Sequence, residues 1–343
     1  MQKKNYVQEI LDIIHSGLPQ AELAEKLSDY HENDLADALA DLTAEERRKL
    51  YAILGVEQVA EIFSYLDDAE PYLKELPPEE AAQVVSHMDS DDAVDALDDL
   101  EEEDKEKIVH QMDKVDKDAA DDVKLLLSYD EDEIGSRMTT NYVAIRSDLT
   151  VRQAMKELVR QAADNDNIST LYAVDDADVL VGAIDLKELI IARENMALED
   201  ILMTSYPYVY ADELVEDCIE RIRGYSEDSI PVLDAENRLC GALTAQDVAE
   251  LVADELGDDY AKLGGLTSEE DLREPAAVSM KKRLPWLIVL LFLGMGVSSV
   301  VGIFESVVAV LPIVICFQSL VLDMAGSVGT QSLAVPIRVL MDE

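Results

Sequence analysis

Three residue types are scarce in this chain of 343 residues, and each scarcity narrows what the protein can be. The 3 cysteines and 4 histidines do not show the spacing of a zinc site, so we expect reduced thiols in a cytosolic setting. Only 28 residues are basic against 74 acidic ones, which leaves a net charge of −46. Nucleic acid and anionic lipid headgroups bind through clustered Lys and Arg, so this balance excludes nucleic acid as a partner and favours cations.

The chain does not lack apolar residues: 48% are hydrophobic and 30% are charged, so it is predicted to fold. The whole negative excess lies in residues 1–280, because the rest carries as many basic as acidic residues. Residues 284–304 form an uncharged run of 21, which spans roughly 30 Å as a helix and matches a bilayer core. A second uncharged run at 306–322 predicts an α-helical transmembrane hairpin.

Basic residues flank these apolar runs and predict their orientation in a lipid bilayer. Residues 281–283 are all basic and precede the first run, and Arg338 follows the second. The positive-inside bias then places both ends in the cytoplasm. We expect a multi-pass protein of the cell (plasma) membrane with residues 1–280 cytoplasmic.

An internal repeat organises the first third of the chain. Residues 33–50 align without gaps on residues 91–108, with eight identities at an offset of 58. The Thr43–Glu46 spacing matches a helix capping box. These patterns predict an all-α helical-repeat domain over residues 1–132.

A second duplication follows, with the alternation of an α/β unit. Residues 137–159 match 202–222, and 180–190 match 239–249. Each copy is predicted to run strand, helix, strand, strand, helix. The methionine-threonine opening and the G-x-[IL]-[DT]-x-x-[DE] close resemble tandem CBS domains, over 133–200 and 201–250.

The resemblance extends through the junction with the membrane part. Residues 244–263 carry apolar positions 248, 251, 252 and 256 beside acids at 247, 250, 254 and 258, which predicts an amphipathic helix. This connecting (plug) helix and its linker occupy residues 244–275, before the apolar runs and the motif GSVGTQS. The domain order and that motif resemble the MgtE family of magnesium transporters.

That resemblance implies an architecture and a partner. The fold would be multidomain: an all-α repeat domain, an α/β CBS pair, a long connecting helix and a membrane domain over 281–343. Members have five membrane helices, so we expect this chain to hold the first two only. The family implies a homodimer through the CBS and transmembrane domains. CBS pairs often carry adenosine nucleotides, which makes ATP a candidate ligand and Glu188, at the ribose-binding position, its candidate residue.

The stretch 89–104, DSDDAVDALDDLEEED, has ten carboxylates in sixteen residues. Drawn as one helix, it places Asp91, Asp95, Asp98 and Glu102 on one stripe. A solvated helix face is the plain interpretation of such a charge run. However, the first repeat has Asn33 in place of Asp91, and most of the other acids are likewise additional to the scaffold. Mg²⁺ prefers oxygen ligands and is commonly held by one or two carboxylates, so it could bridge two acidic faces.

The family resemblance implies a regulatory role for such ions. High cytosolic Mg²⁺ would clamp the repeat domain, the CBS pair and the connecting helix together and close the pore. The implied ligands are Asp91, Asp95, Glu216, Asp247, Glu250, Glu255, Asp258 and Asp259. In the membrane part, Gly326, Ser327, Gly329 and Gln331 are candidates for lining the pore or for close helix packing.

Three other interpretations stay open at this point. The CBS pair would serve as an adenine-nucleotide sensor on another class of membrane protein. An acidic surface adapted to a saline cytosol would carry acids on every face. An enzyme is the weakest alternative, because no nucleophile–base pair, phosphate loop or metal-hydrolase spacing occurs, so we predict no catalysis.

Overall fold

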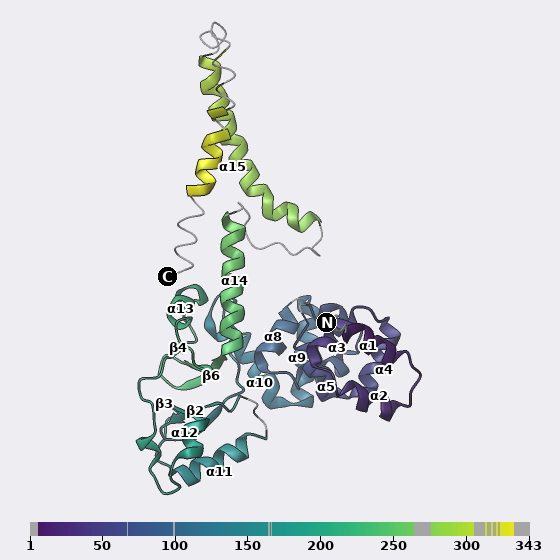
Figure 1. The fold of residues 1–343 in the computed structure, drawn as a ribbon, viewed down its shortest axis with the longest axis vertical. Helices are drawn as coiled ribbons and strands as arrows, with labels where there is room; N and C mark the ends of the chain where they lie inside the picture. The colour runs from purple at the N-terminus through teal and green to yellow at the C-terminus, as the bar shows by residue number, and fades with distance from the viewer. Residues whose placement is uncertain are drawn as a thin grey trace, which may run out of the picture. The chain divides into compact units, whose positions relative to one another are not determined.

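The computed structural model describes residues 6–66, 68–98, 100–163, 165, 167–263, 276–304, 313, 317, 320, 321 and 323–332 (Figure 1). The chain divides into two compact units, residues 1–255 and 256–343, which are described separately.

The first part of unit 1 is helical, as the repeat predicts. Buried leucines and valines from successive helices form its core, including Leu35, Leu39 and Leu97. The α3–α4 and α8–α9 pairs are the two copies of the repeat. The helices are α1 (Tyr6–Ile14), α2 (Gln20–Leu27), α3 (Glu32–Leu39), α4 (Ala44–Leu54), α5 (Val56–Phe63), α6 (Glu70–Leu73), α7 (Pro78–Val85), α8 (Ser90–Asp98), α9 (Glu102–Val115) and α10 (Lys117–Leu126).

The acidic stretch 89–104 is not one helix, and the single stripe that we predicted is therefore wrong. Helix α8 ends at Asp98, and α9 begins at Glu102 after an extended N-cap at Glu101. Leu100, in the connection between the two helices, is buried. The connection therefore approaches the core, and the helix does not continue through it. Glu102 consequently belongs to a different helix from Asp91.

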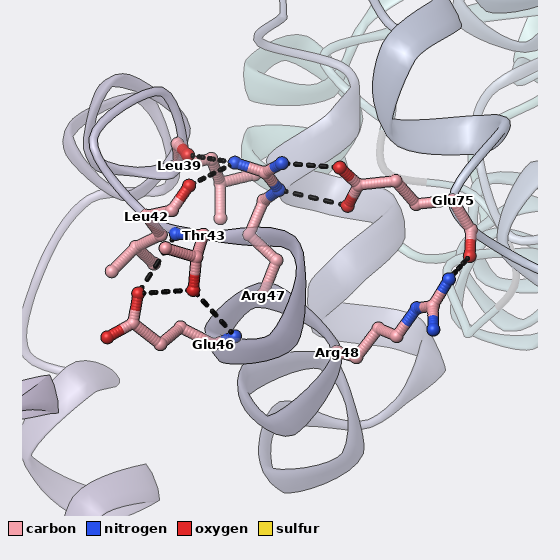
Figure 2. A network of polar contacts seen from close by, with 7 residues as sticks. All are labelled: Leu39, Leu42, Thr43, Glu46, Arg47, Arg48 and Glu75. Atoms are coloured by element: carbon pink, nitrogen blue, oxygen red, sulfur yellow. Dashed lines mark hydrogen bonds and ion pairs between the residues drawn. The ribbon is translucent and has the colours of Figure 1, made fainter.

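The first repeat contains the same break, with a stronger signal. Thr43, which aligns with Glu101, caps α4 in a capping box: its hydroxyl accepts from the Glu46 backbone N–H, and Glu46 accepts from the Thr43 backbone N–H at 2.9 Å (Figure 2). The reciprocal bonds satisfy N–H groups that the helix itself leaves unpaired. The break in the second repeat could therefore have been predicted from the first.

A partly buried ion pair ties this helix pair to the rest of the helical domain. The guanidinium of Arg47 donates to both carboxylate oxygens of Glu75 and to the carbonyls of Leu39 and Leu42, at the end of α3 (Figure 2). The side chains of Arg47 and Glu75 are only 14% and 19% exposed. Arg47 also lies over the Tyr72 ring, 5.2 Å from its centroid.

The remainder of unit 1 contains two three-stranded sheets. The first has the order β1-β2-β3, with β1 parallel to β2 and β2 antiparallel to β3, and the second repeats this pattern as β4-β5-β6. The predicted order of strand, helix, strand, strand, helix is confirmed in both copies. The elements are β1 (Val143–Arg146), α11 (Val151–Gln161), β2 (Thr170–Val174), β3 (Leu180–Asp185), α12 (Leu186–Ile191), β4 (Val209–Tyr210), α13 (Val215–Ile222), β5 (Ser229–Leu233), β6 (Leu239–Thr244) and α14 (Ala245–Leu263), which continues past residue 255 into unit 2.

The helical domain packs against the second sheet rather than the first. Its core is continuous with buried residues of the second copy such as Val232 and Leu243, whereas the first copy has its own cluster around Val143 and Leu171. Residues 132–139 reinforce this pairing: Thr139 and Ala242 exchange backbone hydrogen bonds of 2.8 and 2.9 Å. The helical domain and the start of α14 are thus brought together.

Unit 2 contains a long apolar helix, α15 (Ala276–Ile303). Within the described residues, its segment Ala277–Ile303 is long and apolar enough to cross a membrane, with a hydropathy of 2.3. In the second apolar run, residues 313, 317, 320 and 321 are helical. A continuous helix covers residues 323–332, directly after the run. Most of that run lies outside the described residues, so the transmembrane hairpin stays a prediction.

Replacing Arg47 by Met should destabilise the helical domain strongly, because it leaves the Glu75 carboxylate buried without its partner. We expect a loss of about 3 kcal/mol, the low end for breaking a buried pair. Hydrogen exchange of α3 and α4 peptides would then be about 100-fold faster. Lys49→Met is the matched control, because the Lys49–Glu45 pair on the same helix is 68% and 81% exposed. Equal effects of the two substitutions would contradict the assigned role of Arg47.

Candidate metal site

A network of hydrogen bonds holds the beginning of α8 against the segment that leads into β1. The Thr140 backbone N–H donates to Ser90 Oγ at 2.8 Å, and the Thr140 hydroxyl donates to Asp122 at 3.0 Å. Asn141 donates to Asp89 at 2.9 Å. Ser90 is 7% exposed, so the two Thr140 bonds are partly buried, whereas the Asn141–Asp89 bond is exposed. They place the acidic residues of α8 beside the second sheet.

Helix α14 begins with its own reciprocal cap. The Thr244 backbone N–H donates to the Asp247 carboxylate at 2.7 Å, and the Asp247 backbone N–H donates to the Thr244 hydroxyl at 3.2 Å. This T-x-x-D spacing is a capping-box pattern, so Asp247 has a structural role in addition to any ligand role. The cap fixes Asp247 at the end of α14 that lies next to α8.

Between α8 and α14 lies an acidic cleft of about 740 Å³. Helix α8 contributes Asp92, Asp95 and Asp98 to its lining, and α14 contributes Glu250 and Asp254. Arg137 is the one basic residue among the lining residues. Like charges from two helices therefore face each other across a shared space.

The carboxylates beside this cleft are held in an environment that disfavours their charge. Burial, followed by the charges of Asp247 and Asp92, raises the pKa of Asp91 well above its ordinary value, and a hydrogen bond from Thr139 only partly opposes this. The Oδ1 atom of Asp91 is buried and has no hydrogen-bond partner among the described residues. An unpartnered buried acceptor costs free energy, so this atom is suited to a bound cation or its water.

Two neighbouring carboxylates show the same effect. Burial raises the pKa of Asp92 to about 7, with further contributions from the charges of Asp89 and Asp247, while a hydrogen bond from Ser64 lowers it. Burial also raises the pKa of Asp247 to about 6, against the opposing hydrogen bonds of its Thr244 cap. Both groups would be easier to keep ionised with a cation between them.

Asp95 differs because an internal cation lies beside it. Arg137 Nη1 is 3.3 Å from Asp95 Oδ1, and the Asp95 side chain is 58% exposed. Partial burial raises the pKa of Asp95, and the charge of Arg137 lowers it. An exposed pair of this kind contributes little stability, so it neutralises only part of the cleft.

The arrangement favours a hydrated ion over a fully chelated one. Among the described residues, no three His, Cys, Asp or Glu side chains are grouped closely enough to hold one metal ion. Mg²⁺ commonly keeps several waters and is bound through one or two carboxylates, which suits facing acidic helices. A Ca²⁺ site of six to eight oxygen ligands would need more convergence than the cleft has.

The predicted ligands lie in different places. Asp91, Asp95, Asp247 and Glu250 are brought to the cleft or its edge. Glu216 is exposed in the first turn of α13, and neither it nor the half-buried Glu255 is among the residues that line the cleft. The side chains of two further predicted ligands, Asp258 and Asp259, lie outside the described part of α14.

Sequence reasoning did not name four charged residues of this site as candidates: Asp92, Glu131, Arg137 and Asp254. Asp254 was placed on the acidic stripe of residues 244–263 but was not named among the ligands, although its spacing from Glu250 was a usable signal. The sequence contains no signal for Asp92, because its raised pKa comes chiefly from burial in the folded protein. In the sequence, Arg137 is marked only by its position directly before the methionine-threonine opening of the first CBS copy.

The other candidate residues lie apart from this cleft. Glu188 is exposed on α12, after β3. Gly326, Ser327, Gly329 and Gln331 lie within the helical residues 323–332, where the Thr330 hydroxyl donates to the Gly326 carbonyl at 3.1 Å.

Comparison with family models gives two matches. Residues 30–132 match the MgtE intracellular N domain. Residues 132–195 and 198–254 each match the CBS domain.

Curated relatives match over most of the chain. The magnesium transporter MgtE of Enterococcus faecalis is 36% identical over 301 residues, which is 87% of this chain and 66% of that protein. Its namesake in Bacillus subtilis is 30% identical, over 90% of this chain and 68% of that protein. The magnesium transporter MgtE of Thermus thermophilus is 32% identical, over 93% of this chain and 72% of that protein. The chain therefore spans about two thirds of the length of these relatives.

Two solved structures resemble this chain over nearly three quarters of its length. The soluble part of a magnesium transporter has a TM-score of 0.68 and 29% identity, covering 73% of this chain and 98% of that one. The cytosolic domain of the Mg²⁺ channel MgtE in complex with ATP has a TM-score of 0.64 and 31% identity. The match covers 71% of this chain and 99% of that one.

Acid should stabilise unit 1 in the absence of metal. The folded protein raises the pKa of Asp92 from 3.8 to about 7 and that of Asp247 from 3.8 to about 6, so it favours their protonated forms. The associated stability is present at low pH and is lost as pH rises through about 6 to 7. In EDTA, the midpoint of thermal unfolding by circular dichroism should be several degrees higher at pH 6 than at pH 8.

Asp92→Asn should reduce this difference and raise the midpoint at pH 8. The control is Asp34→Asn, at the equivalent position of the first repeat, which should leave the pH dependence unchanged. A wild-type midpoint that is equal or lower at pH 6 would contradict the electrostatic account.

Proposed function

The chain belongs to the MgtE family of magnesium transporters, and from that membership we propose that it acts as a Mg²⁺ transporter or channel subunit of the plasma membrane. We further propose that its cytoplasmic part senses intracellular Mg²⁺ and closes the pore when the ion is abundant. Helix α15 supports the membrane location, since it is long and apolar enough to cross a bilayer. The helical residues 323–332 would contribute Gly326, Ser327, Gly329 and Gln331 to the pore.

One observation carries the sensing proposal: carboxylates from α8 and α14 face each other with too few cations between them. Asp91 has a buried oxygen without a hydrogen-bond partner, and its pKa is raised partly by Asp247 across the junction. A divalent cation would replace this repulsion with attraction to both helices. The ion would therefore hold the helical domain against the CBS pair.

Each residue has a defined part in this proposal. Asp91 and Asp247 would bind ions at the buried end of the junction, and Asp95 with Glu250 would bind hydrated ions along the open cleft. Asp92 and Asp254 would add charge that retains the cations. The remaining proposed ligands are Glu216, Glu255, Asp258 and Asp259.

Weak sites are sufficient for a switch of this kind. An ion at about ten times its dissociation constant favours the bound form by about 1.4 kcal/mol. Four such ions contribute about 5.5 kcal/mol, which moves an equilibrium from roughly 1:99 to 99:1. Because α14 leads along the chain toward the membrane part, fixing α14 would close the pore, and its release at low Mg²⁺ would open it.

Asp91→Asn should separate the electrostatic and ligand roles of this residue. In EDTA, the variant should be more resistant to limited proteolysis than the wild type, because one repulsive charge is gone. Its further protection by Mg²⁺ should need about tenfold more ion, equivalent to about 1.4 kcal/mol of lost binding.

The matched control for this titration is Asp37→Asn, an exposed carboxylate in the first repeat. It should behave like the wild type in EDTA and in Mg²⁺. An unchanged Mg²⁺ midpoint for Asp91→Asn would refute its role as a ligand and would favour an acidic surface without specific sites.

We also propose that the chain forms a homodimer through its CBS and transmembrane domains. Helices α11 and α12 contact each other and carry exposed Val159, Ile190 and Ile191, at 68%, 62% and 66% exposure. Exposed apolar side chains of this size on two contacting helices are typical of association surfaces. A second copy of the chain is the proposed occupant.

Ile191→Glu should weaken this dimer, because it buries an unpaired charge in the contact. Native mass spectrometry of the full chain should show a larger monomer fraction for this variant. Lys187→Gln is the control, since it makes the same change in net charge at an exposed position of α12. Dimer fractions that do not differ between the variants would place the interface elsewhere.

Adenine-nucleotide sensing is a second candidate function, because the relative's cytosolic domain was solved in complex with ATP. ATP would bind the CBS pair, with Glu188 as the proposed ribose contact. Slower hydrogen exchange in residues 143–191 with ATP, reduced by Glu188→Ala, would support this function. Protection by ATP together with indifference to Mg²⁺ would replace the proposal of magnesium sensing.

A further inference from the structure

The acidic cleft between α8 and α14 contains an arginine in contact with one of the proposed metal ligands. Arg137 Nη1 is 3.3 Å from Asp95 Oδ1 on α8. The other charged residues that line the cleft are six carboxylates: Asp92, Asp95, Asp98, Glu131, Glu250 and Asp254. Arg137 thus occupies a position that the surrounding charges would otherwise offer to a cation.

The backbone that carries Arg137 is attached to the second CBS copy. The Gly135 N–H donates to the Ala211 carbonyl at 2.8 Å, just before α13. Directly after Arg137, the side chain of Met138 is fully buried and packs on Gly241 of β6, where a Cβ atom would not fit. The chain on both sides of Arg137 is therefore fixed, and only the side chain extends into the cleft.

The Arg137–Asp95 pair consequently joins two domains, because Asp95 belongs to the helical domain. The other cation paired with a carboxylate of the cleft has a different position. Lys105 of α9 donates to Asp98 of α8, so both members of that pair lie in the helical domain. Arg137 is placed to resist separation of α8 from the CBS pair, whereas Lys105 is not.

Arg137 and a metal ion would compete for the same carboxylate. The Asp95 side chain is 58% exposed, so a hydrated ion can reach it from the open cleft. A divalent ion bound there would lie close to the guanidinium and repel it. An exposed pair contributes little stability, so the ion would displace the arginine readily.

We propose that Arg137 is a built-in counter-ion that takes the place of a metal ion at Asp95, an inference that rests on the proposed magnesium sensing. When Mg²⁺ is scarce, the guanidinium holds α8 to the second CBS copy and limits how far the two separate. When Mg²⁺ is abundant, the ion binds Asp95 and Arg137 turns toward solvent. The arginine therefore sets the metal-free baseline of the switch and leaves its metal-bound state unchanged.

The test is limited proteolysis of the full chain in lipid nanodiscs, comparing Arg137→Gln with the wild type. Cleavage is measured in EDTA at pH 6, where protonation of Asp92 and Asp247 favours contact between the domains without metal. The variant should be cleaved up to about threefold faster, a factor that matches the small contribution of an exposed ion pair. In saturating Mg²⁺ the two proteins should be cleaved equally, because the ion has replaced the guanidinium.

Two further variants separate the contact from net charge. Arg137→Lys keeps the charge at a contact made by one donor atom, so it should restore most of the protection in EDTA. Arg152→Gln loses the same charge from a side chain that is 76% exposed on α11, away from the cleft, and should match the wild type in both conditions.

Two outcomes would overturn this proposal alone. Equal cleavage of Arg137→Gln and the wild type in EDTA would show that the pair does not hold the domains. A difference that persists in saturating Mg²⁺ would assign Arg137 a structural role without exchange for the ion. A wild type that gains no protection from Mg²⁺ at pH 8 would overturn magnesium sensing as well.

Discussion

The structure of unit 1 depends on tolerating repulsion between carboxylates of α8 and α14 at a partly buried junction. Burial and like charge together raise the pKa values of Asp91, Asp92 and Asp247. The ionised form of each group is therefore less stable there than in water. Arg137 supplies one positive charge against this excess, at Asp95 only. On the proposed account, a junction of this kind is stable when a cation or proton is present and weak when neither is. Its strength is thereby tied to the composition of the surrounding solution.

The rest of the unit supplies the forces that hold these charges close. The hydrophobic core runs without interruption from the helical domain into the second sheet, including Met112 and Val232, which are fully buried. The Ser90–Thr140–Asp122 bonds and the Thr244–Asp247 cap then set the positions of α8 and α14. Apolar burial is insensitive to dissolved ions, whereas charge repulsion across a cleft is not. In the proposed mechanism, opposing the two would let a small change in ion binding alter domain contact without unfolding either domain.

Much of the fold could be predicted from the sequence because it is duplicated. Two copies of a helical pair and two copies of a strand-helix-strand-strand-helix unit each reveal their pattern twice, and helical periodicity put residues 250 and 254 on one stripe of α14, where Glu250 and Asp254 both line the cleft. The single helix predicted over 89–104 failed because Leu100 is drawn into the core, an effect of tertiary packing. Asp92 was missed for the same reason, since its altered pKa arises from helices distant in sequence. Charge density pointed to the segment that contributes Asp92, Asp95 and Asp98 to the cleft, but only packing selects which carboxylates are buried.

The central claim is that divalent ions hold the acidic faces of α8 and α14 together. The most direct test is the distance distribution between spin labels at Glu79 on α7 and Glu236 on the turn before β6, both exposed, measured by pulsed electron resonance on the full chain. The account predicts a broad distribution in EDTA at pH 8 that becomes narrow as Mg²⁺ is added, with no such change when Asp91 and Asp247 are both replaced by Asn. A distribution that is equally narrow with and without Mg²⁺ would contradict it.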